Sequence, residues 1–173
     1  SAGNTGALLV ISKLNLKMIE NIDKPALSAL WPNKKSMSVV LDLGANIECS
    51  SKNLLDFSIM GASLYTSLYS NNKPNVGLLN IGSEELKGNE IIKETYQLLN
   101  EKKLNDFNFS GYIEGNELMN GDVNVIVSDG FTGNVALKTA EGTANFITSE
   151  LKKAMTGSLI GKIASILNIS NLN

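Results

Sequence analysis

Residues 123–138 read VNVIVSDGFTGNVALK, and this stretch decides the fold that we expect. Its β-branched start is typical of a strand buried on both faces of a parallel sheet. The run ends in Ser-Asp-Gly, and helical spacing resumes at Val135, which predicts a helix N-terminus capped near Thr132 or Asn134. A strand, a glycine-rich loop and a helix N-terminus together form a geometry suited to holding an anion.

The same layout recurs upstream in looser form, without a linker between the elements. We expect strands at residues 26–31, 38–43, 75–80 and 107–113, and helices at 8–22, 53–70, 91–99 and 134–155, with a short helical turn at 116–119. A polar turn joins the first two strands, which predicts an antiparallel pair. The alternation predicts one α/β layered domain with a mostly parallel sheet, whose glycine loops collect at the carboxyl ends of the strands.

Composition excludes several kinds of chemistry. The 173 residues carry a net charge of only -2, so nothing global indicates nucleic acid. The chain has no His and no Arg, which removes Ser-His and Cys-His nucleophile pairs, a zinc ligand set and bidentate phosphate recognition. Cys49 is the single cysteine, so no internal disulfide forms. The remaining option is direct attack of one bound substrate on another, with the protein supplying position and electrostatic stabilisation.

The sequence shows neither a membrane span nor a signal peptide. Its longest apolar run covers only residues 7–11, far short of the roughly 20 residues that cross a bilayer. Because the chain opens within a glycine-rich motif and has no initiator Met, we interpret it as a fragment of something longer.

Four loops rich in Gly and Asn are the candidate ligand-binding segments. Gly permits close backbone approach, and Asn offers a donor and an acceptor without charge, which suits a polar, phosphate-bearing ligand. The candidate binding residues in these loops are Gly3, Asn4, Thr5, Gly6, Gly44, Asn46, Asn80, Gly82, Gly88, Asn89, Gly130 and Gly133. None of the loops is a P-loop or a complete dinucleotide-binding fingerprint.

Four motifs resemble a known family. SAGNTGA at 1–7, LDLGAN at 41–46, GLLNIGSEELKGNE at 77–90 and SDGFTGNVALKT at 128–139 are similar to the bacterial phosphate acyltransferases of phospholipid synthesis (PlsX). The resemblance implies transfer of a fatty acyl group from acyl carrier protein to inorganic phosphate, without a cofactor or metal. It also implies a three-layer α/β/α fold like that of isocitrate and isopropylmalate dehydrogenases and phosphotransacetylase.

The resemblance further implies a place in the cell. The family forms homodimers, attaches peripherally to the inner face of the cytoplasmic membrane, and supplies acyl phosphate to a membrane glycerol-3-phosphate acyltransferase. The family also carries glycine-rich segments before and after the region that this chain matches.

Both lines of reasoning lead to one mechanistic hypothesis. Phosphate, held by backbone N–H groups and by Lys87 or Lys138, attacks the thioester carbonyl. Amides such as Asn4, Asn46 or Asn134 stabilise the oxyanion, and Asp129 orients a donor or takes a proton.

Several of these candidates also have structural interpretations. Asp129 suits an N-cap, and Lys138 suits a solvated helix position. Asp42, inside a strand, is better explained as a carboxylate held by backbone N–H groups than as a catalytic group. Cys49 has no neighbouring base to activate it, so we expect an inert small side chain.

The C-terminal residues have a different pattern. We expect an acyltransferase domain over 1–155 and an amphipathic helical extension over 156–173, locally positive because of Lys152, Lys153 and Lys162. Its apolar stripe consists of Leu159, Ile160, Ile163, Ile166 and Leu167. Membrane contact and dimerisation are equally good explanations of this stripe.

Two other functions remain open from the sequence. An NAD-dependent dehydrogenase of the isocitrate or isopropylmalate type shares the expected fold, but the chain has no Arg cluster for a carboxylate substrate and no Asp cluster at metal-ligand spacing. The other alternative is a non-catalytic module that docks acyl carrier protein or membrane.

Overall fold

The computed structural model describes residues 5–69, 73–102 and 104–157. The chain divides into two compact units, Ser1–Val135 and Ala136–Asn173. The sheet and the helices packed on it belong to the first unit, and the described part of the second is a single helical segment.

The first unit is built on one five-stranded sheet. Its strands are β1 (Ser28–Pro32), β2 (Met37–Leu41), β3 (Asn75–Asn80), β4 (Asn108–Glu114) and β5 (Val125–Val127), in the order β1-β2-β5-β3-β4. The first two strands pair antiparallel, and all the other pairs are parallel. The predicted antiparallel pair and the mostly parallel sheet are therefore confirmed.

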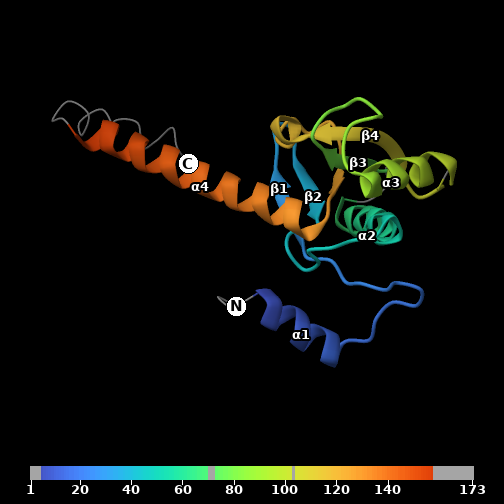
Figure 1. The fold of residues 1–173 in the computed structure, drawn as a ribbon. Helices are drawn as coiled ribbons and strands as arrows, with labels where there is room; N and C mark the ends of the chain where they lie inside the picture. The colour runs from blue at the N-terminus through green and yellow to red at the C-terminus, as the bar shows by residue number, and fades with distance from the viewer. Residues whose placement is uncertain (1–4, 70–72, 103, 158–173) are drawn as a thin grey trace. The chain divides into compact units, whose positions relative to one another are not determined.

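Two helices pack on this sheet and complete its core. Figure 1 shows α2 (Ser51–Tyr69) and α3 (Glu90–Glu101) side by side against the strands. The β-branched residues of β5 are fully buried, as their continuous run in the sequence predicts. They pack in one core cluster with residues of the neighbouring strands and of both helices, including Val39, Leu41, Leu54, Phe57, Val76, Leu78, Ile92, Leu99, Val125 and Val127.

The first helix is shorter than predicted. α1 spans Thr5–Asn15, whereas the apolar spacing predicts helix as far as Ile22. The Asn15 side chain donates to the carbonyl of Ile11, and Leu14 is exposed beside it. Periodicity alone does not extend a helix whose last turn gains no packing.

The last helix begins earlier than predicted. After a short 3-10 turn at Gly115–Glu117 and strand β5, α4 spans Gly130–Thr156, so the expected start near residue 134 is wrong. Its first six residues belong to the first unit and the rest to the second. The stripe at 159–167 lies outside the described residues.

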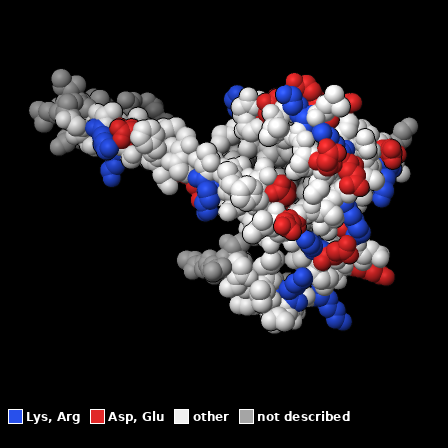
Figure 2. Space-filling model, viewed as in Figure 1, with Lys and Arg blue, Asp and Glu red and all other residues white. Residues whose placement is uncertain are grey.

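The surface of the described part carries both signs of charge. On the face that Figure 2 shows, Lys and acidic side chains are interspersed, without a broad single-sign patch. Among the described helices, none is long and apolar enough to cross a membrane.

Candidate functional site

Three helix N-termini border one open cavity at the carboxyl ends of the parallel strands. α2 follows β2, α3 follows β3 and α4 follows β5, so the first residues of all three helices lie at the same edge of the sheet. The cavity has a volume of about 1030 Å³. Its lining includes Ser50 and Ser51 at α2, Asn89 at α3, and Asp129 and Thr132 at α4. The predicted convergence of the loops after β2, β3 and β5 is confirmed.

A buried carboxylate organises the loop after β2. Asp42 is fully buried and accepts five hydrogen bonds. The N–H groups of Leu27, Gly44 and Ala45 donate to Oδ1 at 3.0, 3.2 and 3.0 Å. Asn46 donates to Oδ2 twice, through its backbone N–H and its side-chain amide, each at 2.7 Å. Asp42 therefore fills this nest of donors itself, as the structural interpretation of its sequence position predicts.

The start of α4 is capped by a carboxylate. Asp129 Oδ1 accepts from the Thr132 N–H at 2.8 Å, and Oδ2 accepts from the Thr132 hydroxyl at 2.8 Å. This is N-cap geometry, so the N-cap is Asp129, and the expected cap at Thr132 or Asn134 is wrong. The carboxylate occupies the place where an open helix N-terminus would hold an anion.

The first two glycines of α4, Gly130 and Gly133, serve close packing rather than loop freedom. A Cβ on Gly133 would lie 1.9 Å from the Asp42 carbonyl oxygen, and one on Gly130 would lie 2.5 Å from the Asn46 carbonyl oxygen. That same oxygen accepts from the Gly130 N–H at 2.8 Å. Only residues without a Cβ let α4 approach the 42–46 loop this closely.

The loop between β3 and α3 is held by amide side chains. Asn80 donates to the carbonyls of Gly82 and Lys87, each at 3.1 Å, and Gly88 adopts a φ of 94° beside it. Asn89 caps α3 by accepting from the Ile92 N–H at 2.9 Å. The Lys87 side chain is exposed and is not part of the cavity lining.

The side-chain amides of Asn46, Asn80 and Asn134 differ in whether they are free to bind a ligand. The Asn46 side chain donates to the Pro25 carbonyl and to Asp42, and Asn80 is occupied as described, so both hold loops in place. Asn134 is exposed, lies beside Gly44, and has no side-chain hydrogen bond to any described residue. Of the three described amides at positions 46, 80 and 134, Asn134 is thus the one with free donors.

Cys49 lines the same cavity as an unactivated thiol. It is 7% exposed, and its Sγ donates to the Asn46 carbonyl at 3.6 Å. Burial raises the pKa of the thiol above its ordinary value of 9.0, and Asp42 adds to this effect, while the Gly130 N–H opposes it. A thiol protonated at neutral pH is a poor nucleophile.

The remaining predicted residues are not among the lining residues of the cavity or are outside the described part. Lys138, in the second unit, forms an exposed ion pair with Glu141 at 2.8 Å. Thr5 and Gly6 open α1, and Gly3 and Asn4 lie outside the described residues. Within the described ranges, no group of His, Cys, Asp and Glu side chains is arranged to hold a metal ion.

Sequence reasoning missed several lining residues. Lys24 lines the cavity and donates to the Glu48 carbonyl at 2.8 Å, and it is the one cation among the residues of this lining. In the sequence, Lys24 lies next to Pro25 after the first helix, where the pattern indicates only the end of that helix. Ser50 and Asn53 were also missed, and they cap α2 reciprocally at 3.0 and 3.2 Å. Ser at the N-cap position is the sequence signal that could have found this helix start.

Comparison with known proteins shows the family of the chain. All of residues 1–173 match the family model described as "Fatty acid synthesis protein". The chain belongs to this family. A phosphate acyltransferase from Pelagibacter ubique is 82% identical over 172 residues, which are 99% of this chain and 52% of that protein. Another from Maricaulis maris is 47% identical over 165 residues, which are 95% of this chain and 47% of that protein.

A solved structure supports the fold alone. The EutD phosphotransacetylase from Staphylococcus aureus superimposes with a TM-score of 0.58 at 17% identity, over 75% of this chain and 45% of that one. The architecture of this member of the fatty acid synthesis protein family is three-layer α/β with a mostly parallel sheet, as predicted. The chain spans about half the length of the curated relatives it matches.

Proposed function

We propose that this chain is part of a phosphate acyltransferase, which moves a fatty acyl group from acyl carrier protein to inorganic phosphate. The observation that carries the proposal is the 82% identity, over nearly the whole chain, to a protein named phosphate acyltransferase. The product is an acyl phosphate for phospholipid synthesis. The dehydrogenase alternative is not favoured, because these relatives are named acyltransferases.

The cavity at the three helix N-termini supports direct transfer between bound substrates. Its described lining offers no activated nucleophile, since the chain has no His and the Cys49 thiol is protonated. Each helix N-terminus contributes roughly half a positive charge. These charges and Lys24 offset the carboxylates of Glu48, Glu94 and Asp129 in the lining.

The roles of individual residues belong to the same proposal. Phosphate is held by backbone N–H groups and by one lysine, which is Lys24 if phosphate binds in this cavity and Lys87 or Lys138 if it binds elsewhere. A phosphate oxygen attacks the thioester carbonyl, the C–S bond breaks, and the carrier leaves as the thiol with the proton that phosphate gives up. Asn134, with its free amide, and Asn4 stabilise the oxyanion. Asp129 orients the attacking phosphate or takes a proton, in addition to capping α4.

The proposed function includes a homodimer and a location at the membrane. An isocitrate and isopropylmalate dehydrogenase-like fold over 1–155, a homodimer, and a C-terminal amphipathic segment over 156–173 follow from the family resemblance. The protein acts in the cytoplasm, against the inner face of the membrane, where a glycerol-3-phosphate acyltransferase takes up the product. Flotation with anionic vesicles tests the segment. A Leu159→Glu, Ile163→Glu variant that still floats excludes its membrane role.

The reaction itself is tested with a full-length protein that contains this chain. Acyl carrier thioester and inorganic phosphate are supplied, and hydroxylamine traps acyl phosphate as the hydroxamate. Phosphate-dependent hydroxamate supports the transfer. Binding of acyl carrier protein without product indicates the docking module, and nicotinamide cofactor binding without product indicates the dehydrogenase.

A further inference from the structure

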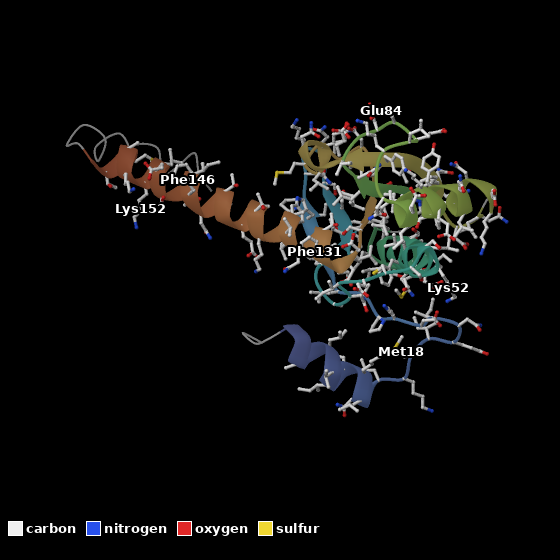
Figure 3. All side chains as sticks on the ribbon, viewed as in Figure 1. Met18, Lys52, Glu84, Phe131, Phe146 and Lys152 are labelled. Atoms are coloured by element: carbon white, nitrogen blue, oxygen red, sulfur yellow. The ribbon has the colours of Figure 1, made fainter. Side chains whose placement is uncertain are left out.

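Three large apolar side chains stand exposed around this cavity. Ile47 precedes α2, and Ile91 is the second residue of α3. Phe131, which Figure 3 labels, is the second residue of α4. They are 72%, 40% and 63% exposed, and all three line the cavity. Single exposed apolar residues are ordinary on protein surfaces, but three from separate elements around one cavity mark a binding surface.

The cavity is therefore amphipathic. Leu54 and Ile92, both buried, continue the apolar part of the lining, while Ser51, Asn89 and Asp129 supply its polar part. Its volume, about 1030 Å³, is at the upper end of the range for small-molecule sites. A ligand that fits such a lining has a polar reacting end and a long apolar part, which describes a fatty acyl thioester.

We propose that Ile47, Ile91 and Phe131 form an acyl wall that contacts the hydrocarbon chain of the substrate and sets chain-length preference. This inference rests on the proposed function and adds the residues that recognise the acyl group. The N-termini of α2, α3 and α4 each have a polar capping residue and, within a few positions, a residue of the acyl wall. The thioester carbonyl therefore lies near the capping residues, while the hydrocarbon chain lies along the wall.

The test compares substrates of two chain lengths on the full-length protein. Because each buried methylene changes binding by about fourfold, a contact with the hydrocarbon chain appears as a higher kcat/KM for palmitoyl than for butyryl carrier thioester. Phe131→Ala is expected to lower the palmitoyl-to-butyryl ratio about tenfold. The matched control is Phe146→Ala, since Phe146 is 65% exposed on the same helix but does not line the cavity, and it leaves the ratio within about twofold.

Three results would overturn the acyl wall. An unchanged ratio in Phe131→Ala removes the contact with the chain. An equal loss of kcat/KM for both thioesters would mean that Phe131 contacts the carrier part that both substrates share, and not the hydrocarbon chain. A loss of unfolding stability with no change in the ratio means that another part of the protein covers these side chains.

A binding measurement separates this inference from the proposed function. If the wild-type protein forms no acyl phosphate from either thioester, the proposed function fails, and calorimetric titration with palmitate and butyrate then tests the wall alone. Palmitate binding that weakens in Phe131→Ala and not in Phe146→Ala supports the wall. Palmitate binding that is absent, or equal in wild type and Phe131→Ala, overturns it.

Discussion

Asn46 donates two hydrogen bonds to the same carboxylate oxygen of Asp42, from its backbone N–H and from its side-chain amide, each at 2.7 Å. This pair closes the turn after β2 and places the Asn46 carbonyl where the Gly130 N–H meets it. One buried carboxylate thus fixes the position of the loop against which α4 begins.

Replacing Asp42 with Asn is expected to destabilise the protein by about 3 kcal/mol. The amide turns an acceptor into a donor that faces N–H groups, so at least one donor of the buried nest loses its partner. Urea unfolding measures the change. The control is Asp122→Asn in the exposed ion pair with Lys35, which changes stability by less than about 1 kcal/mol. Equal stabilities of the two variants would contradict the role of the nest.

Gly133→Ala and Gly142→Ala are expected to have opposite effects, although both glycines lie in α4. A Cβ on Gly133 meets the Asp42 carbonyl at 1.9 Å and forces α4 away from the loop, which costs roughly 2 kcal/mol or more. Gly142 has nothing within 4 Å of its Cβ position, so Ala there removes a helix-interior glycine and stabilises by up to about 1 kcal/mol. Thermal unfolding of both variants decides the matter. A Gly133→Ala protein as stable as wild type would show that the helix start shifts freely.

These contacts explain which parts of the site are predictable from sequence. The strands and the glycine turns that follow them are predictable from local patterns such as the VIV of β5. Asp42 is recognisable as an inward carboxylate, although β2 ends one residue before it. The start of α4 is not predictable from the sequence, because Gly130 and Gly133 have the pattern of loop residues. Only the folded structure shows that they belong to the helix and pack against the 42–46 loop. Lys24 and Phe131 line the cavity only through tertiary placement, so no local signal marks them.

Cys49 is expected to react slowly with thiol reagents. The side chain is buried and its pKa lies above 9.0, so at pH 8 iodoacetamide should modify it at least about tenfold more slowly than free cysteine. The thiolate forms only as the pH rises through this raised pKa. The folded state then binds more protons than the unfolded state, so stability falls as the pH rises above 9.0. Fast modification of the native protein at pH 8, equal to that in urea, would disprove the burial of the thiol.

Lys24→Ala is expected to raise the KM for phosphate about tenfold, because one charge-assisted hydrogen bond to the anion is lost. Phosphate-dependent formation of acyl phosphate by the full-length protein measures it. Lys24→Arg keeps the charge and recovers part of the affinity. The control is Lys93→Ala, which removes only the ion pair with Glu90 at 3.1 Å on α3. If Lys87→Ala or Lys138→Ala raises the KM and Lys24→Ala does not, the phosphate lies away from this cavity.

Asn134→Ala is expected to lower kcat by roughly a hundredfold while the protein stays folded. Its amide lies beside Gly44 with no hydrogen bond to a described residue, so its removal breaks no such bond, but it withdraws a donor from the developing oxyanion. Asn145→Ala, on an exposed position of the same helix, controls for loss of an amide and keeps the wild-type rate. Turnover and urea unfolding are measured on both variants of the full-length protein. Near-normal acyl phosphate formation by Asn134→Ala would remove this residue from the site, and the oxyanion would then need donors from outside the described part of the chain.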